Sequence, residues 1–294
     1  MAVVGLVISI LVLGSIGAHA FGFPILISFL FASMILPTDP VSVLALFKEL
    51  GAPQRLATLV EGESLFNDGI GVVIFSSILA LVQSSQETGE SLESLITIST
   101  ISNMVVNISA NTVGGIAIGL AAGYLVYRIM VNLDEHMTEI VLTVILAYGS
   151  FLLAEHFVGV SGVIATVVAG LFIGNKGAEY AMSPQTKISI FNTWETAAFL
   201  VNTFIFLLIG AKTPIGQLIN NAQLIGIAIV LVLLARAVAV YPVMFVVNRF
   251  INNDVSPNYQ HVIVWSGLHA SIPIALVLGL SSNVPFVNEL RAMV

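Results

Sequence analysis

Three acidic side chains and one basic side chain lie inside segments of the chain that are otherwise almost wholly apolar. Asp39 precedes a proline, Glu63 and Asp68 lie within the next apolar run, and Arg236 lies midway along a later one. A charge at the centre of a bilayer costs roughly 2.5–3.5 kcal/mol on the insertion scale, so each of these residues needs a function or a partner. Carboxylates are the hard oxygen ligands that alkali cations prefer, and they also bind protons.

Helical spacing divides the acidic residues between two faces of one predicted helix. Ser64 and Asp68 are four residues apart and share a face, whereas Glu63 and Asn67 share the adjacent face. The first face presents a hydroxyl and a carboxylate, and carbonyl groups near Thr38, with its hydroxyl, complete a set of oxygen ligands. This pattern predicts a site for an alkali cation.

Glu63 needs a counter-charge in the membrane, and Arg236 is the basic residue available to it. We predict that the two form a structural ion pair, because an unpaired buried charge costs far more than a matched one. The alternative is that Asp39, Glu63 and Asp68 all belong to a purely structural polar network.

Competition at Asp68 predicts a mechanism. The carboxylate holds a cation or a proton, but not both well, so cation binding on one side of the membrane releases a proton there. Exchange then requires only alternating access, in which one bundle of helices moves against another around the site.

Three further titratable residues are weaker candidates. His269 lies in a second interrupted run, and histidine titrates close to physiological pH, so it is a candidate for a pH response or for a vestibule. Glu61 lies near the predicted cytoplasmic end of the apolar run Leu56–Val82. Glu195 lies at the predicted cytoplasmic end of the run Ile190–Gly210, where it could draw cations toward an entrance.

The composition indicates that lipid is the solvent of this chain. Of 294 residues, 57% are hydrophobic and 9% are charged, with a mean hydropathy of +1.04. A soluble domain carries charge on about 25% of its residues. The nine Lys and Arg residues are spread over the whole length, which argues against a nucleic-acid partner. The absence of cysteine excludes disulfides and thiolate metal sites.

Apolar runs long enough to cross a bilayer predict an all-α polytopic membrane protein. We treat residues 1–294 as a single, partial transmembrane domain of about nine spans and a truncated tenth from Val284. The nine runs are Val3–Ala18, Phe23–Phe47, Leu56–Val82, Ile101–Tyr127, Glu139–Phe157, Val160–Gly174, Ile190–Gly210, Leu224–Val247 and Val262–Leu280. With alternating spans, six loop Lys and Arg residues fall on one side and one on the other, which places the basic side in the cytoplasm.

Two of these spans are interrupted. Thr38-Asp39-Pro40 falls in the second span, and Ser266–Pro273 falls in the ninth. Proline removes a backbone donor, and free carbonyls at membrane depth are tolerated where they line a cavity or are buried in protein. The two broken spans run in opposite directions, a pattern typical of inverted-repeat transporters with a site at the midplane.

A stripe of glycines marks the fourth span. Gly115, Gly119 and Gly123 repeat every four residues, a spacing that lets helices approach closely. We assign the stripe mainly to packing within the chain, with a contact between two subunits as the alternative.

The motifs together resemble the NhaP-type branch of the monovalent cation:proton antiporters. The residues that carry the resemblance are Thr38–Gly51, Glu61–Gly69, Ser161–Leu171 and Phe191–Gly210. The resemblance implies an inverted-repeat antiporter fold with two broken, crossing helices, a homodimer, and a six-helix core that moves against a dimerisation domain.

The resemblance also implies roles for individual residues. Asp68 is the carboxylate that binds Na⁺ and H⁺, together with Thr38 and Ser64, and its motif partner is Asn67. Asp39 flanks the site. The Asn-Asp form of the motif is associated with electroneutral exchange. Where many members have Gly-Leu-Arg-Gly, this chain has Gly-Leu-His-Ala at residues 267–270, without the permanent charge.

The expected function is therefore secondary antiport of Na⁺, Li⁺ or K⁺ against H⁺, in the plasma membrane and without a cofactor. One alternative is a cation channel or another cation carrier of related fold, but a channel favours rings of repeated groups over one asymmetric cluster. A serine-type intramembrane enzyme is less favoured, because Ser64 lacks the second glycine of a nucleophile elbow.

Overall fold

The computed structural model describes residues 2–133, 135–212, 215–250, 255–267 and 271–294, and all regular secondary structure in these ranges is helical. By length and composition, six of the described helices are able to cross a membrane. The expected all-α class is therefore confirmed. The chain divides into two compact units, one made of Met1–Ile101 with Ala211–Val294 and the other of Ser102–Gly210.

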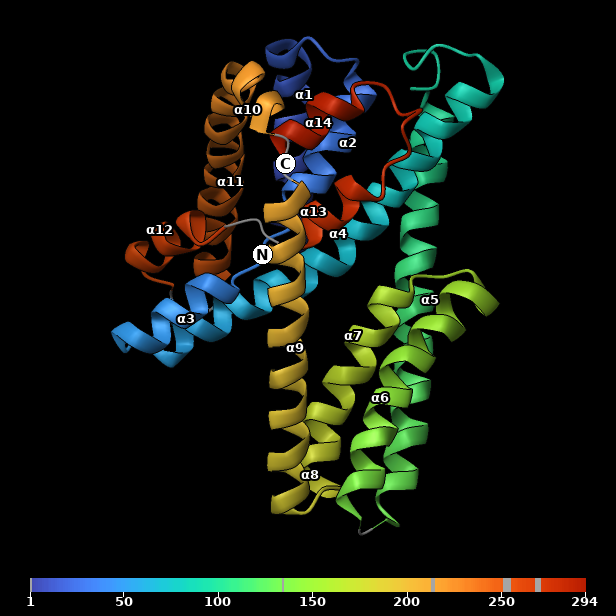
Figure 1. Cartoon of the computed structure of the whole chain (residues 1–294), viewed down its shortest axis with the longest axis vertical. Coiled ribbons are helices and arrows are strands. Elements are labelled where there is room, and N and C mark those ends of the chain that lie inside the picture. The colour runs from blue at the N-terminus through green and yellow to red at the C-terminus, as the bar shows by residue number, and fades with distance from the viewer. Residues whose placement is uncertain (1, 134, 213–214, 251–254, 268–270) are drawn as a thin grey trace. The chain divides into compact units, whose positions relative to one another are not determined.

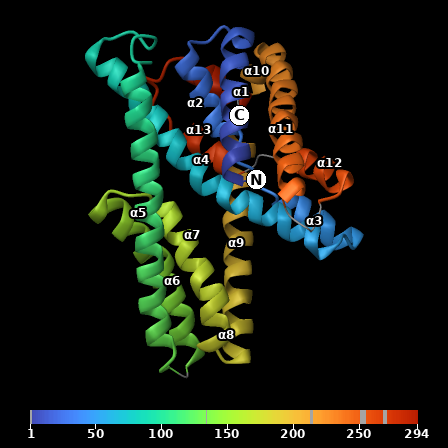
Figure 2. The same cartoon turned by 180° about the vertical axis from the view of Figure 1, so that it is seen from behind.

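The first unit contains the polar residues of the predicted cation site and of the predicted ion pair. Its helix α1 packs against α2, α4 and α11 (Figures 1 and 2). The helices of this unit are α1 (Ala2–Phe21), α2 (Ile25–Ile35), α3 (Val41–Leu50), α4 (Gln54–Thr88), α10 (Ile215–Asn220), α11 (Ala222–Phe250), α12 (Pro257–Trp265), α13 (Ser271–Leu278) and α14 (Val287–Met293).

The predicted interruption of the second span is present. Helix α2 ends at Ile35 and α3 begins at Val41, so the five residues between them, with two prolines, leave the helix. At Gly71 of α4, an added Cβ would overlap the ring of Pro37. The lack of a side chain at Gly71 thus lets α4 approach the break closely.

The ninth predicted span is also interrupted. Helix α12 begins at Pro257, after Ser256 caps its first turn by accepting a hydrogen bond from the amide of Tyr259. It ends at Trp265, and α13 begins at Ser271. His269, a candidate for the pH response, lies outside the described residues.

An apolar cluster joins three helices of the first unit. Leu56 and Val60 of α4 pack with residues of α11 and α12, and all are at least 94% buried. The other members are Val240, Met244, Val255, Ile263 and Val264. This contact fixes α12 against α4 and α11, and so positions the last turn of the broken helix.

In the second unit, α5, α6 and α7 lie side by side (Figures 1 and 2). Its elements are α5 (Ile98–Met130), α6 (His136–Leu152), a π-helical turn (Leu153–Val158), α7 (Gly162–Phe172), a second π-helical turn (Ile173–Gly177), α8 (Ala178–Tyr180) and α9 (Pro184–Lys212). Helices α5 and α9 each extend slightly beyond the unit.

The glycine stripe of α5 packs within this unit. A Cβ at Gly115 would approach the carbonyl oxygen of Ser161, and one at Gly119 would overlap that of Ala165. Gly123 lies against Phe172. The close approach is between α5 and the segment that begins and forms α7, which gives the stripe the packing role that we favoured.

Candidate functional site

Helix α4 carries four of the predicted site residues on adjacent faces. Ser64 and Asn67 are buried, with 5% and 2% of their surfaces exposed. Asn67 Nδ2 donates to Glu63 Oε1 at 3.5 Å, as residues four apart on a helix are able to do. Asp68 follows Asn67, so its side chain points away from this pair and toward the face of Ser64.

The break between α2 and α3 lies against the face of α4 that carries Ser64. The Ser64 hydroxyl donates to the carbonyl oxygen of Thr38, which is itself buried. Asp68 lies one helical turn after Ser64 on α4, and Asp39 follows Thr38 in the break, near enough for its charge to act on that of Asp68. The structure therefore brings Thr38, Asp39, Ser64 and Asp68 together.

One oxygen of Asp68 is available to a ligand. Its Oδ1 atom is buried and accepts no hydrogen bond from the residues that the structure describes. A buried polar atom normally has a partner. Asp68 is four residues after Ser64, so its carboxylate shares the helix face where the Ser64 oxygen and the Thr38 carbonyl also present lone pairs.

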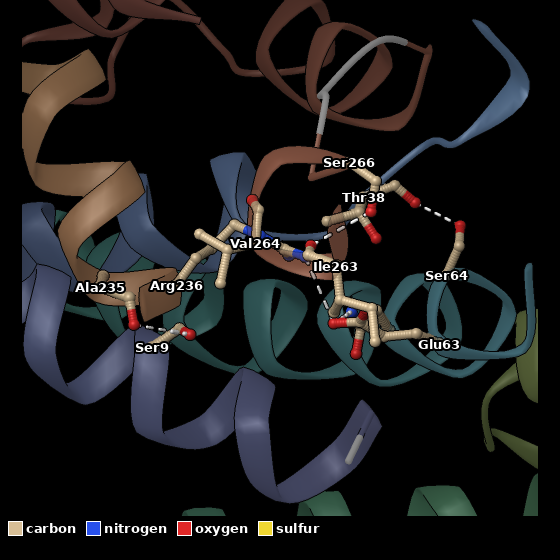
Figure 3. A network of polar contacts seen from close by, with 10 residues as sticks. Ser9, Thr38, Glu63, Ser64, Ala235, Arg236, Ile263, Val264 and Ser266 are labelled. Carbon is tan, nitrogen blue, oxygen red and sulfur yellow. Dashed lines mark hydrogen bonds and ion pairs between the residues drawn. The ribbon is translucent and has the colours of Figure 1, made fainter. Parts of the chain in front are cut away.

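The predicted partners Glu63 and Arg236 lie in contact. Arg236 Nη2 is 3.5 Å from Glu63 Oε1, and the two side chains are 4% and 8% exposed. Arg236 also donates to backbone carbonyls at the end of α12, from Nη2 to Ile263 O at 2.8 Å and from Nε to Val264 O at 3.3 Å (Figure 3). The arginine thus joins α4 to the broken helix as well as neutralising a carboxylate.

The residues after α12 fit closely around this arginine. Ser266 Oγ donates to Ile263 O at 3.1 Å, so that carbonyl accepts a second hydrogen bond. A Cβ at Gly267 would overlap the Arg236 guanidinium. The sequence did not predict these carbonyl contacts. The arginine itself was the available signal, because a guanidinium has five N–H donors and one carboxylate cannot accept them all.

The weaker candidates lie apart from this cluster. Glu61 is exposed on α4, and Glu195 is exposed on α9, within the second unit. A further polar residue, Ser9 on α1, was not predicted and lies beside Glu63, Asn67 and Arg236 around one cavity. Its only signal in the sequence is a hydroxyl inside an apolar span.

Comparison with known proteins points to one family. A family model described as the transmembrane sodium/hydrogen exchanger matches residues 1–292. The chain is 40% identical to the Na⁺/H⁺ antiporter NhaG of Bacillus atrophaeus over 281 residues, which are 96% of this chain and 51% of NhaG. It is 35% identical to the Na⁺/H⁺ antiporter NhaH of Halobacillus dabanensis over 280 residues, 95% of this chain and 66% of NhaH.

A solved structure shares the fold. The sodium proton antiporter MjNhaP1 of Methanocaldococcus jannaschii superposes with a TM-score of 0.78 at 21% identity, over 99% of this chain and 71% of MjNhaP1. The chain spans about half the length of several of the curated relatives that it matches. The two interrupted spans are those expected from the resemblance, and the family model covers residues 1–292. The chain therefore belongs to the sodium/hydrogen exchanger family.

Proposed function

We propose that this chain carries the ion-exchange site of a secondary antiporter, which swaps cytoplasmic Na⁺, or Li⁺ or K⁺, for H⁺ across the plasma membrane. The observation that carries the proposal is the buried Oδ1 atom of Asp68, which accepts no hydrogen bond from the described residues. The relatives named above are Na⁺/H⁺ antiporters, which supports the same cargo.

In this proposal three kinds of oxygen bind the cation. Asp68 supplies the negative charge. Ser64 donates its only hydroxyl proton to Thr38 O, so its oxygen keeps lone pairs for a metal ion, and the Thr38 carbonyl keeps a second lone pair. Oxygen ligands of this type suit alkali cations better than nitrogen or sulfur ligands do.

Cation and proton exchange one for one at this carboxylate. When Na⁺ binds, the O–H bond of the protonated Asp68 breaks and the proton leaves to water on the same side of the membrane. On the other side, a proton displaces Na⁺. Asn67 is neutral in both states, so one positive charge moves each way and the exchange is electroneutral.

Alternating access requires two bodies that move as units. The division of the chain into two compact units is consistent with this requirement, and Thr38, Asp39, Ser64 and Asp68 all belong to the first unit. We propose that the first unit moves against the second during transport, and that the complete protein forms a homodimer.

The test uses everted vesicles that contain the full-length parent protein and a dye that reports internal acid. Adding Na⁺ and then K⁺ to the wild type restores dye fluorescence, whereas Asp68→Asn restores none. Glu87→Gln is the matched control, because Glu87 is an exposed acid on the same helix. Recovery that survives in Asp68→Asn disproves the site, and no recovery in a correctly inserted wild type favours a channel or another cargo.

A further inference from the structure

A small cavity lies where α1, α4 and α11 meet in the first unit. Its volume is about 10 Å³, and its polar lining comes from Ser9, Glu63, Asn67 and Arg236. Leu6 and Leu36 are among the apolar residues that enclose it. A space of this size, measured with a water-sized probe, is close to the smallest that holds one water molecule.

The side-chain oxygen of Asn67 has no hydrogen-bond partner among the described residues. Asn67 is 2% exposed, and its Oδ1 atom accepts no hydrogen bond from the described residues. The orientation of the amide follows from its other end, since Nδ2 faces Glu63 Oε1 and an ionised carboxylate is only an acceptor. Oδ1 therefore needs a donor from elsewhere.

Ser9 lies on the wall formed by α1. Its hydroxyl donates to Ala235 O over 3.4 Å, near the upper limit for a hydrogen bond, and its lone pairs are open to a donor (Figure 3). Ser9 and Asn67 both line the cavity, so the hydroxyl group and Oδ1 are the acceptors that we expect a molecule bound there to meet. Arg236 and Glu63 both line the cavity and pair with each other, so their opposite charges offset and a neutral molecule suits the space.

We propose that one buried water molecule occupies this cavity and donates hydrogen bonds to Asn67 Oδ1 and Ser9 Oγ, which makes Ser9 a positioning residue for the ion-binding motif. Asn67 precedes Asp68 on α4, so a water that holds the amide against α1 also fixes the rotation of the helix that presents the carboxylate. The positioning role rests on the proposed function of Asp68, whereas the presence of the water does not.

The direct test is a structure of the full-length parent protein at a resolution that shows ordered waters. We expect one density peak within hydrogen-bond distance of Asn67 Oδ1 and Ser9 Oγ. A cavity without density, in a map that shows other buried waters, overturns the proposal. So does a peak with the five or six short oxygen contacts of a bound cation.

The functional test compares substitutions of Ser9 in the vesicle assay. Ser9→Val fills the cavity and displaces the water, so the apparent KM for Na⁺ rises by about three- to tenfold, as expected for one lost hydrogen bond, while the maximal rate changes little. Ser9→Thr keeps the hydroxyl and the wild-type KM. Ser28→Ala, the loss of a buried hydroxyl with no described partner, leaves the KM unchanged.

The outcomes separate the two proposals. An unchanged KM in Ser9→Val shows that Ser9 does not position the motif. If Ser9→Val is not inserted, Ser9→Ala removes the same oxygen with less change in volume and must raise the KM in the same direction. A wild type that exchanges no ions refutes the proposed function, but the water density still tests the cavity.

Discussion

Arg236 offers the sharpest test of how the site is held together. Replacing it with methionine removes the ion pair to Glu63, whose side chain is only 8% exposed, and both hydrogen bonds to the end of α12. At 3.5 Å and an effective dielectric constant of about 20, the attraction between the two charges is about 5 kcal/mol before desolvation is considered. Removing one member of a buried pair costs about 3–5 kcal/mol.

The two lost hydrogen bonds to α12 destabilise the protein less than the lost ion pair does. Ile263 O keeps its hydrogen bond from Ser266 Oγ, so the loss falls mainly on Val264 O. A hydrogen bond between membrane helices contributes about 0.6 kcal/mol on average. We therefore expect Arg236→Met to lower the free energy of unfolding by about 3–5 kcal/mol, most of it from the stranded carboxylate of Glu63.

A double-mutant cycle measures the interaction energy between Glu63 and Arg236 separately from the other effects of the substitution. Glu63→Gln alone leaves the buried Arg236 charge without a counter-charge but keeps an oxygen for Asn67 and Arg236, so it costs about 1.5–3 kcal/mol, the scale of a hydrogen bond to a charged group. Adding it to Arg236→Met removes the stranded charge, so the double mutant is more stable than Arg236→Met alone, with a coupling of up to about 3 kcal/mol.

The assay is reversible unfolding of the purified full-length parent protein in mixed micelles, titrated with a denaturing detergent. Arg249→Met is the matched control, because Arg249 is an exposed residue of the same helix, and its effect lies within about 0.5 kcal/mol of zero. Additive losses in the double mutant refute the reasoning, since they mean that Glu63 and Arg236 do not interact.

Three further outcomes are expected. Lowering the pH raises the apparent KM for Na⁺ by about tenfold per pH unit once protons occupy the site carboxylate, because Na⁺ and H⁺ compete for it. A KM for Na⁺ that does not depend on pH in the vesicle assay contradicts this competition. Gly267→Ala forces the Arg236 guanidinium to move and destabilises the protein by about 1–3 kcal/mol in the detergent titration, whereas Gly226→Ala, with open space around it, does not. Gly119→Ala pushes α5 away from α7 at a similar cost, and equal unfolding midpoints for Gly119→Ala and the unobstructed Gly149→Ala would disprove that contact.

The sequence by itself determined the long helices and which polar side chains share a face of α4. Apolar runs and prolines located the long helices and both interruptions, because bilayer thickness and the missing proline donor act locally along the chain. Spacing along one helix grouped Ser64 with Asp68 and Glu63 with Asn67, since helical periodicity alone sets which side chains share a face. Elimination then paired Glu63 with Arg236, because a buried charge needs a counter-charge.

The hydropathy pattern predicted the ends of the helices less accurately than their existence. Helix α9 begins at Pro184, six residues before the predicted Ile190, and the predicted run from Val160 to Gly174 ends in a π-helical turn. The short helix α10 was not predicted. Helix ends depend on caps and on neighbouring segments, which a hydropathy pattern does not record.

Only the tertiary structure decided which distant segments meet at the site. Ser9 contacts the carbonyl of Ala235 across 226 positions of sequence, and Arg236 reaches Ile263 O across 27. The partners are backbone carbonyls, which every residue has, so no residue type marks them. The cavity beside Asn67 likewise depends on how three helices pack, because its volume is the space that their side chains leave unfilled.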